Sequence, residues 1–282
     1  MKQRGFWTYI CFIAWIAGVF LLYTPILTLI AYSFFSDGSH GFGGQFNFDA
    51  YRDLVENRDL VTALLTSIKV GVASASISLV LGAFAAITLQ RLSRKKPSSF
   101  AKISSNDFLC KTANFVVSAL TLLPLLLPEI VFGLGLLVWF VLLKISLGSF
   151  SLTLAHVTFS VSYVFLTVSS RMRLIDLSIE DAARDLGATS IQILSAVYLP
   201  ILAPAMVAGW VMAFALSFDD FLISFFTAGP DTITLPLALY SSIKFGVSPS
   251  IFAVSTLVFG VSFLSATLLA RLMGGVSKSQ PL

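Results

Sequence analysis

The segment DLSIEDAARDLGATSIQILSAVYLP, Asp176–Pro200, is a polar stretch between two long apolar runs, at 150–170 and 201–227. Ser178 is placed to cap a short helix, and Gly187 to end it, because glycine tolerates the left-handed backbone that follows many helices. Four residues at helical spacing predict one small apolar face on this helix: Ile179, Ala182, Ala183 and Leu186. Small side chains allow close backbone approach, so this face is suited to docking against another protein.

A second helix is predicted directly after the first. Thr189 and Gln192 have the spacing of a capping pair, and the helix is expected to run as far as Leu199-Pro200. We therefore expect two short helices in the 176–200 segment, at the surface of an otherwise apolar chain.

The composition around this segment is that of a membrane protein. Of 282 residues, 57% are hydrophobic and 11% are charged, and the mean hydropathy is +0.91. Soluble domains carry about 25% charged residues, and a bilayer-spanning helix needs roughly 20 apolar residues. Six runs of suitable length occur, at about 7–35, 60–90, 113–147, 150–170, 201–227 and 249–273. The sequence predicts an all-α membrane protein with six transmembrane helices.

The basic residues predict the orientation of these helices. With a cytoplasmic N-terminus, the inner segments hold 13 of the 18 Lys and Arg residues: Lys2, Arg4, Arg91, Arg94, Lys95, Lys96, Lys102, Lys111, Arg171, Arg173, Arg184, Arg271 and Lys278. Positive charge concentrates on the cytoplasmic side of membrane proteins. Both termini are therefore expected in the cytoplasm, and the net charge of +4 indicates topology rather than nucleic-acid binding.

The third apolar run, LLPLLLPEIVFGLGLLVWF, is irregular. Pro124 and Pro128 each remove a backbone donor, and Glu129 follows directly. Carbonyls freed inside a membrane must find partners in neighbouring helices or face a cavity. Glu129 has two interpretations at this stage, as a residue of a functional site or as the start of a helix near the interface.

Two adjacent carboxylates lie in the apolar stretch FALSFDDFLISFF, residues 214–226. If their side chains faced lipid at the bilayer centre, inserting Asp219 and Asp220 into the membrane would together cost roughly 5–7 kcal/mol. They are expected to face protein or water, and to line a pathway. The alternative is that they cap a helix break beside Ser217. His156, which has no Cys or Glu partner nearby, is expected to be a packed, hydrogen-bonded residue.

The 176–200 segment resembles the EAA loop of bacterial ABC-transporter permeases: Glu-Ala-Ala, three residues, Gly, nine residues, Ile, one residue, Leu-Pro. Asp181-Ala182-Ala183, Gly187, Val197 and Leu199-Pro200 follow that spacing, with Asp181 and Val197 as mild departures. Over about 60–270, stretches such as LLPEIVFGLGLL, LAHVTFSVSYV and GWVMAFALSFDDFLISFFTAGP resemble the spermidine/putrescine permeases.

This resemblance implies the transmembrane domain of a type I (MetI-like) ABC importer. The implied partners are cytoplasmic ATP-binding subunits, a second homologous permease and an external substrate-binding protein, at the bacterial inner membrane. The expected ATPase-coupling residues are Glu180, Asp181, Ala182, Ala183, Arg184 and Gly187. The implied boundaries are an N-terminal helix and outer loop at 1–59, a permease core at 60–273 and a cytoplasmic tail at 274–282.

A polyamine substrate agrees with the sign of the buried charges. Carboxylates replace part of the water around each ammonium group, and aromatic faces offer cation–π contacts. The expected pathway residues are Asp219, Asp220, Glu129, Phe225 and Trp210. No Gly-Lys pair occurs, so the chain has no G-x-x-x-x-G-K-[ST] phosphate loop. ATP hydrolysis is expected in a partner chain, and neither a metal nor a cofactor is expected in this one.

Three other functions fit the sequence less well. An ABC importer for iron, a sugar or an anion shares the EAA spacing, although an anion path should contain intramembrane Lys or Arg. An intramembrane protease needs a nucleophile with a general base, and His156 has no recognisable serine elbow beside it. A secondary transporter is disfavoured by the EAA spacing.

Overall fold

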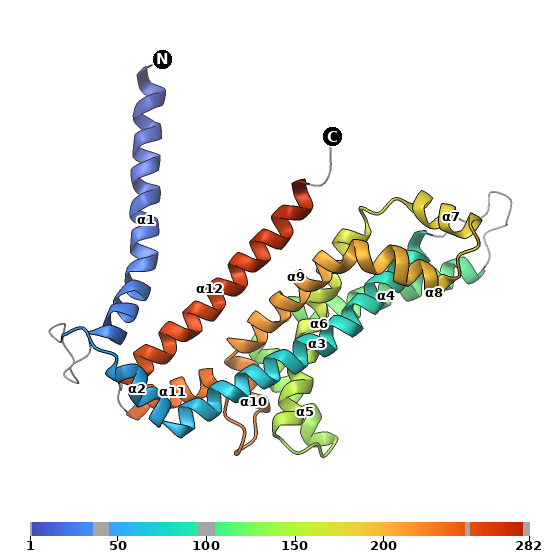
Figure 1. The fold of residues 1–282 in the computed structure, drawn as a ribbon. Coiled ribbons are helices and arrows are strands. Elements are labelled where there is room, and N and C mark those ends of the chain that lie inside the picture. Colours follow the sequence, from blue (N-terminus) through green and yellow to red (C-terminus); the bar gives the residue numbers. More distant parts are fainter. Residues whose placement is uncertain (1, 36–44, 95–104, 246–248, 279–282) are drawn as a thin grey trace. The chain divides into compact units, whose positions relative to one another are not determined.

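The computed structural model describes residues 2–35, 45–94, 105–245 and 249–278, and all regular structure in them is helical (Figure 1). The helices are α1 (Lys2–Phe34), α2 (Asp49–Glu56), α3 (Arg58–Arg94), α4 (Ser105–Leu126), α5 (Glu129–Leu142), α6 (Ser149–Met172), α7 (Leu177–Asp185), α8 (Ser190–Ile193), the π-helix η1 (Leu194–Tyr198), α9 (Leu199–Phe218), α10 (Leu222–Thr227), α11 (Leu235–Phe245) and α12 (Pro249–Lys278). The all-α prediction is confirmed. The Gly-rich start of the outer loop and the middle of the basic 91–111 loop lie outside the described residues.

Five helices in the described part of the chain are long and apolar enough to cross a membrane, and one bent pair brings the total to six if it counts as one span. The bent pair is Phe115–Leu126 with Glu129–Leu142, whose axes differ by 113°. The third apolar run is therefore broken rather than continuous. The first helix ends at Leu126, Pro128 is the N-cap of α5, and Glu129 is the first residue of α5, so the interpretation of Glu129 as a helix start is confirmed.

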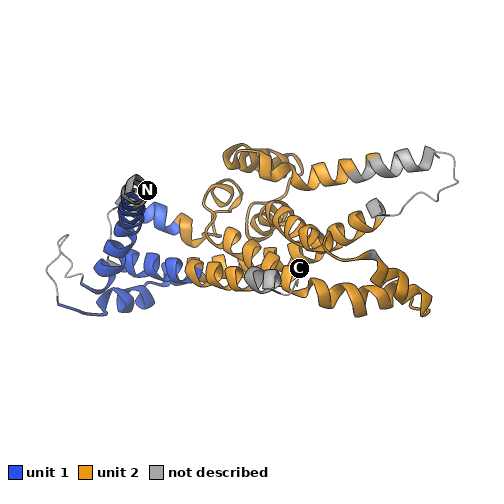
Figure 2. Cartoon of the chain, turned by 90° about the horizontal axis from the view of Figure 1, so that it is seen from above, with its two compact units in different colours: residues 1–62, 238–261 blue, residues 63–237, 262–282 orange. Residues whose placement is uncertain are grey.

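The chain forms two compact units, which Figure 2 shows in different colours. The first contains residues 1–62 and 238–261. Its aromatic side chains gather around the end of α1, where Phe34 lies 5.2 Å from Tyr51 and 5.6 Å from Phe46 between ring centroids. Helix α2 is short and amphipathic, with Ala50 and Leu54 buried.

The second unit, residues 63–237 and 262–282, is organised around α6. Two glycines bring neighbouring helices against it. A Cβ on Gly82 of α3 would lie 2.8 Å from Val164 Cβ, and one on Gly209 of α9 would lie 3.4 Å from Val164 Cα. Because contacts this short leave little room for a side chain, glycine sets the spacing of α3, α6 and α9. The core between them includes Ala86, Val168, Met172, Tyr198 and Leu202.

The helix predicted to end near Leu199-Pro200 continues instead into the next span. Residues Ser190–Phe218 form one span of 29 residues through α8, η1 and α9. Pro200 lacks the N–H that a regular α-helix would donate to the carbonyl of Ala196. The helix accommodates this by a π turn, in which Leu199 N–H bonds to Leu194 O. The prediction of a short, separate second helix was therefore wrong.

Candidate functional site

The apolar run that carries the two aspartates, at 201–227, is interrupted at the point where they occur. Helix α9 ends at Phe218 and α10 begins at Leu222, so the 201–227 run is not one continuous helix. We call Asp219–Phe221 the aspartate break. Asp219 still donates its backbone N–H to Ala215 O at 3.3 Å, which closes the last turn of α9.

Asp220 is engaged by the backbone of α10. Its carboxylate accepts from Ser224 N at 2.8 Å and from Ile223 N at 3.3 Å, and its side chain is 8% exposed. The first N–H groups of a helix lack partners within the helix, and an acidic side chain at its start satisfies them. The capping interpretation is thus confirmed for Asp220.

His156 of α6 connects the break to the core. It is 1% exposed, and its ring lies between two hydroxyls, with Nδ1 at 2.6 Å from Ser217 Oγ and Nε2 at 3.1 Å from Ser224 Oγ. Nε2 also lies 3.5 Å from Asp220 Oδ2. Ser74 of α3 donates to Ser217 at 3.0 Å. The prediction of a packed, hydrogen-bonded His156 is confirmed, and its cluster holds α3, α6, α9 and α10 together.

The other predicted pathway residues differ from Asp220 in exposure. Asp219 and Glu129 are exposed, and Phe225 is 54% exposed. Helices α5 and α10 pack closely, since a Cβ on Gly133 would lie 2.9 Å from Phe226 Cδ2. Glu129 is one turn before Gly133 on α5, but in the described part of the chain it forms no hydrogen bond or ion pair with either aspartate.

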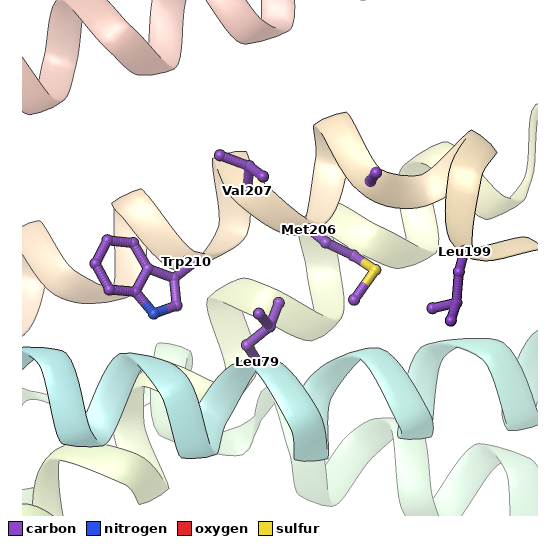
Figure 3. A pocket seen from close by; sticks show the side chains of 6 residues that line it. Leu79, Leu199, Met206, Val207 and Trp210 are labelled. Carbon is purple, nitrogen blue, oxygen red and sulfur yellow. The ribbon is translucent and has the colours of Figure 1, made fainter. Parts of the chain in front are cut away.

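Trp210 lies in a different environment. It is nine residues before Asp219, about 13 Å along the helix axis, and its Nε1 donates to Ser76 Oγ at 3.1 Å. Its ring stacks on Phe214 at 5.7 Å. Trp210 also lines a groove of ≈ 410 Å³ between α3 and α9, where Figure 3 shows it beside apolar side chains. The other lining residues are Leu79, Leu199, Ala203, Met206 and Val207. The groove offers no carboxylate to a cation.

The first helix of the 176–200 segment is α7, and its cap differs from the prediction. Asp176, not Ser178, is the N-cap, and its side chain accepts from Ser178 N at 3.0 Å. Gly187 has φ +80°, as expected for the residue that ends the helix. The capping box of Thr189 and Gln192 is present at the start of α8.

The apolar face predicted for α7 is divided in the structure. Ala182 is exposed, whereas Ala183 packs against the core. Leu186 lies past the last helical residue and is 89% exposed. Ile179 and Ile191 are also exposed, at 43% and 77%. We call Ile179, Ala182, Leu186 and Ile191 the docking surface.

Glu180 is the centre of a charged cluster that the sequence did not reveal. Its Oε1 lies 2.7 Å from Arg184 Nη2 and 3.2 Å from Arg91 Nη2, and Tyr198 donates its hydroxyl to Oε2. Burial raises the pKa of Glu180, but the hydrogen bonds from Tyr198 and Arg184 and the charge of Arg91 outweigh burial and leave the pKa below its usual value. Arg91 is 89 positions away, so only the helix packing could place it here.

Metal binding has no support in this region. Among the residues that the structure describes, no group of three or more His, Cys, Asp or Glu side chains could hold a metal ion. The chemistry available at the aspartate break is hydrogen bonding and charge, and the serine hydroxyls that contact His156 are buried with it.

These features define an integral membrane protein with an apolar run that is interrupted at two adjacent aspartates. Residues 98–275 match the family model of the binding-protein-dependent transport system inner membrane component. This chain belongs to that family and is the permease subunit of such a transporter.

Named relatives cover nearly the whole chain. The putrescine transport system permease protein PotI of Escherichia coli (strain K12) is 36% identical over 264 residues, covering 90% of this chain and 88% of the relative. The spermidine/putrescine transport system permease protein PotC of the same strain is 37% identical over 255 residues, covering 89% of each.

Solved structures support the same fold. The bacterial alginate ABC transporter in complex with an alginate pentasaccharide-bound periplasmic protein aligns with a TM-score of 0.66 over 96% of this chain and 93% of that one, at 15% identity. The MetNI methionine ABC transporter aligns with a TM-score of 0.58 over 76% and 95%, at 18% identity. The all-α fold is therefore the MetI-like importer fold that the sequence predicted.

Proposed function

We propose that this permease moves polyamines, such as spermidine and putrescine, into the cytoplasm of a bacterium. The observation that carries the proposal is the exposed carboxylate of Asp219 at the aspartate break. An anion in a transmembrane path attracts a cation and disfavours anionic solutes. The names of the relatives PotI and PotC agree with a cationic substrate of this type.

The two aspartates have different roles in this proposal. Asp220 already accepts two backbone hydrogen bonds and is 8% exposed in its side chain, so it has little capacity left for a passing ammonium group. Asp219 ends α9 and remains exposed. Asp219 therefore guides the cation, and Asp220 holds the break open in the correct geometry. Phe225 and Glu129, both exposed, are further candidates for substrate contact, and Trp210 is the weakest.

ATP-driven movement enters through the docking surface. A separate ATP-binding subunit would cover Ile179, Ala182, Leu186 and Ile191, whose apolar side chains are exposed in this chain. Asp181 is exposed beside them and is available for a polar contact with the same partner. A second permease subunit and an external substrate-binding protein complete the proposed importer.

The membrane placement follows the charge distribution. Both termini are placed in the cytoplasm in this proposal, because Lys2, Arg4 and Arg271 lie at the ends of apolar runs and positive charge concentrates on the cytoplasmic side. The proposed divisions are 1–59, the core at 60–273 and the tail at 274–282, of which residues 279–282 lie outside the described structure.

The test is ATP-dependent uptake by the complete importer reconstituted in vesicles. Labelled putrescine or spermidine should enter only with ATP, and excess unlabelled polyamine should suppress uptake while a neutral sugar and an anion do not. Uptake of a sugar, an anion or iron instead of a polyamine would contradict the proposed substrate. It would leave this chain as the permease of another ABC importer.

A further inference from the structure

The side chain of Glu180 is turned inward from a helix whose other polar residues are exposed. It is 12% exposed, whereas Asp181, the next residue of α7, is exposed. A carboxylate covered in this way is unavailable to a partner subunit. Its bonds lead to three positions within this chain: Arg184 on α7, Arg91 on α3 and Tyr198 on η1.

We infer that Glu180, Arg91 and Tyr198 form a tether that carries the movement of α7 to α3 and α9, rather than a contact with the ATP-binding subunit. The inference rests on the proposed ATP-driven importer. It assigns Glu180 a positioning role inside the permease and leaves the docking surface to the neighbouring exposed residues.

The first anchor of the tether is Tyr198. Its residue is 1% exposed, and it belongs to the core formed by α3, α6 and α9. Only its hydroxyl reaches out of that core, to Glu180 Oε2. A displacement of α7 is therefore transmitted to a side chain that is packed on all sides and cannot yield independently of its helix.

The second anchor is Arg91. Its guanidinium contacts Glu180 and also lies over the ring of Tyr198, with Cζ 4.6 Å from the centroid. Leu89, two residues earlier on α3, is buried in the same core. The three side chains thus contact one another pairwise, and such a closed triangle resists shear better than a single ion pair.

The backbone at the anchor is also suited to transmission. Tyr198 is the last residue of the π turn η1, immediately before α9, which ends 20 residues later at Phe218, the residue before Asp219. A π turn marks a local irregularity where a helix can change direction. Movement that enters at Tyr198 therefore has a continuous helical path to the aspartate break.

The bond to Arg184 has a different character. Arg184 is four residues from Glu180 on the same helix and is 51% exposed, so this pair stabilises α7 itself and connects it to no other element. The tether accordingly consists of the contacts that leave α7.

The test uses the complete transporter in lipid nanodiscs, with Cys11 and Cys110 replaced by serine and a single cysteine introduced in the last turn of α9 as Ala215→Cys. Maleimide labelling of that cysteine with and without ATP reports whether movement reaches the end of α9. In the parent complex, ATP should change the labelling rate. Glu180→Gln and Arg91→Gln should reduce that change by about fivefold or more, while ATP hydrolysis and assembly of the complex persist.

Two further variants separate positioning from general damage. Tyr198→Phe keeps the packed ring and removes only the hydroxyl. This variant should also reduce the ATP-dependent change in labelling rate. The double variant of Glu180→Gln and Arg91→Gln should lose no more than either single one, since the two side chains act as one unit. Arg52→Gln, which removes an exposed pair with Glu56 on α2, is the control and should label as the parent does.

Three results would contradict the tether. An unchanged labelling response in assembled Glu180→Gln complexes would overturn the tether. Loss of the ATP-binding subunit from that variant would do so as well, because it would make Glu180 a docking residue. Absence of any response in an ATP-hydrolysing parent would show that no movement reaches α9. None of these measurements requires polyamine, so an error in the proposed substrate would not affect them.

Discussion

The aspartate break and the tether each contain a carboxylate with little exposure, but they satisfy it by different means. Asp220 is held by two backbone N–H groups and lies beside the ring of a buried histidine. Glu180 is held by two guanidinium groups and a phenol. The first arrangement fixes the backbone just past the end of α9, and the second joins α7 to side chains at the ends of two candidate spans. A carboxylate therefore stabilises a local backbone conformation at the aspartate break, whereas a carboxylate at the tether links separate helices.

The largest effect is expected where the backbone depends on the carboxylate. Asp220→Ala would leave the N–H groups of Ile223 and Ser224 without their partner, at a cost of about 1–3 kcal/mol for each buried group. Thermal unfolding of the purified protein in detergent should show a clear fall in Tm. Asp219→Ala is the matched control, because its side chain is exposed, and an equal fall in both variants would contradict the assigned capping role.

The histidine that supports the break should have the next largest effect. His156→Leu preserves much of the volume but leaves the hydroxyls of Ser217 and Ser224 without the ring nitrogens, and it should destabilise the protein by roughly 2–3 kcal/mol. Ser160→Ala, on the same helix, is the control, since Ser160 Oγ is buried without a hydrogen-bond partner in the described structure. Equal Tm values for His156→Leu and Ser160→Ala would contradict the stabilising role assigned to His156.

The tether should respond to pH in a defined direction. Folding lowers the pKa of Glu180, so its contribution to stability is fully present above the pKa of an unfolded glutamate, about 4.3. The contribution is lost as the pH falls through the lower folded value. The groups that face Glu180 are Arg91, Arg184 and Tyr198.

Thermal stability measured against pH for wild type and Glu180→Gln tests this direction. The wild type should be more stable at neutral pH, and the difference should shrink on acidification below the ordinary glutamate range. A difference that grows toward acid would mean that Glu180 carries a proton in the folded protein.

The smallest effect is expected at the cap of α7. Asp176→Ala should destabilise the helix by about 1 kcal/mol, with faster hydrogen exchange of the amides in the first turn. Ser178→Ala is the control, because the structure places Asp176 rather than Ser178 at the cap. Greater exchange in the Ser178 variant would restore the prediction made from the sequence.

The sequence predicted the fold class, because six apolar runs and the EAA spacing are local patterns. It also predicted Gly187 and the Thr189–Gln192 cap, whose signals lie within a few residues. It did not predict the partners of Glu180, since Arg91 and Tyr198 are brought to it by tertiary packing. For the same reason it left the roles of Asp219 and Asp220 undivided: adjacent residues of one type differ here only by the direction in which the backbone turns at the end of α9.

The most direct test of the central claim compares Asp219→Asn with Asp220→Asn in the same reconstituted importer, with Asp53→Asn on α2 as the control. Polyamine uptake per assembled complex and Tm are measured for each. Asp219→Asn should keep the wild-type Tm but reduce uptake per complex about tenfold, which corresponds to roughly 1.4 kcal/mol. Asp220→Asn should chiefly lower Tm. Normal uptake by a stable Asp219→Asn complex, with uptake lost in an equally stable Asp220→Asn complex, would contradict it.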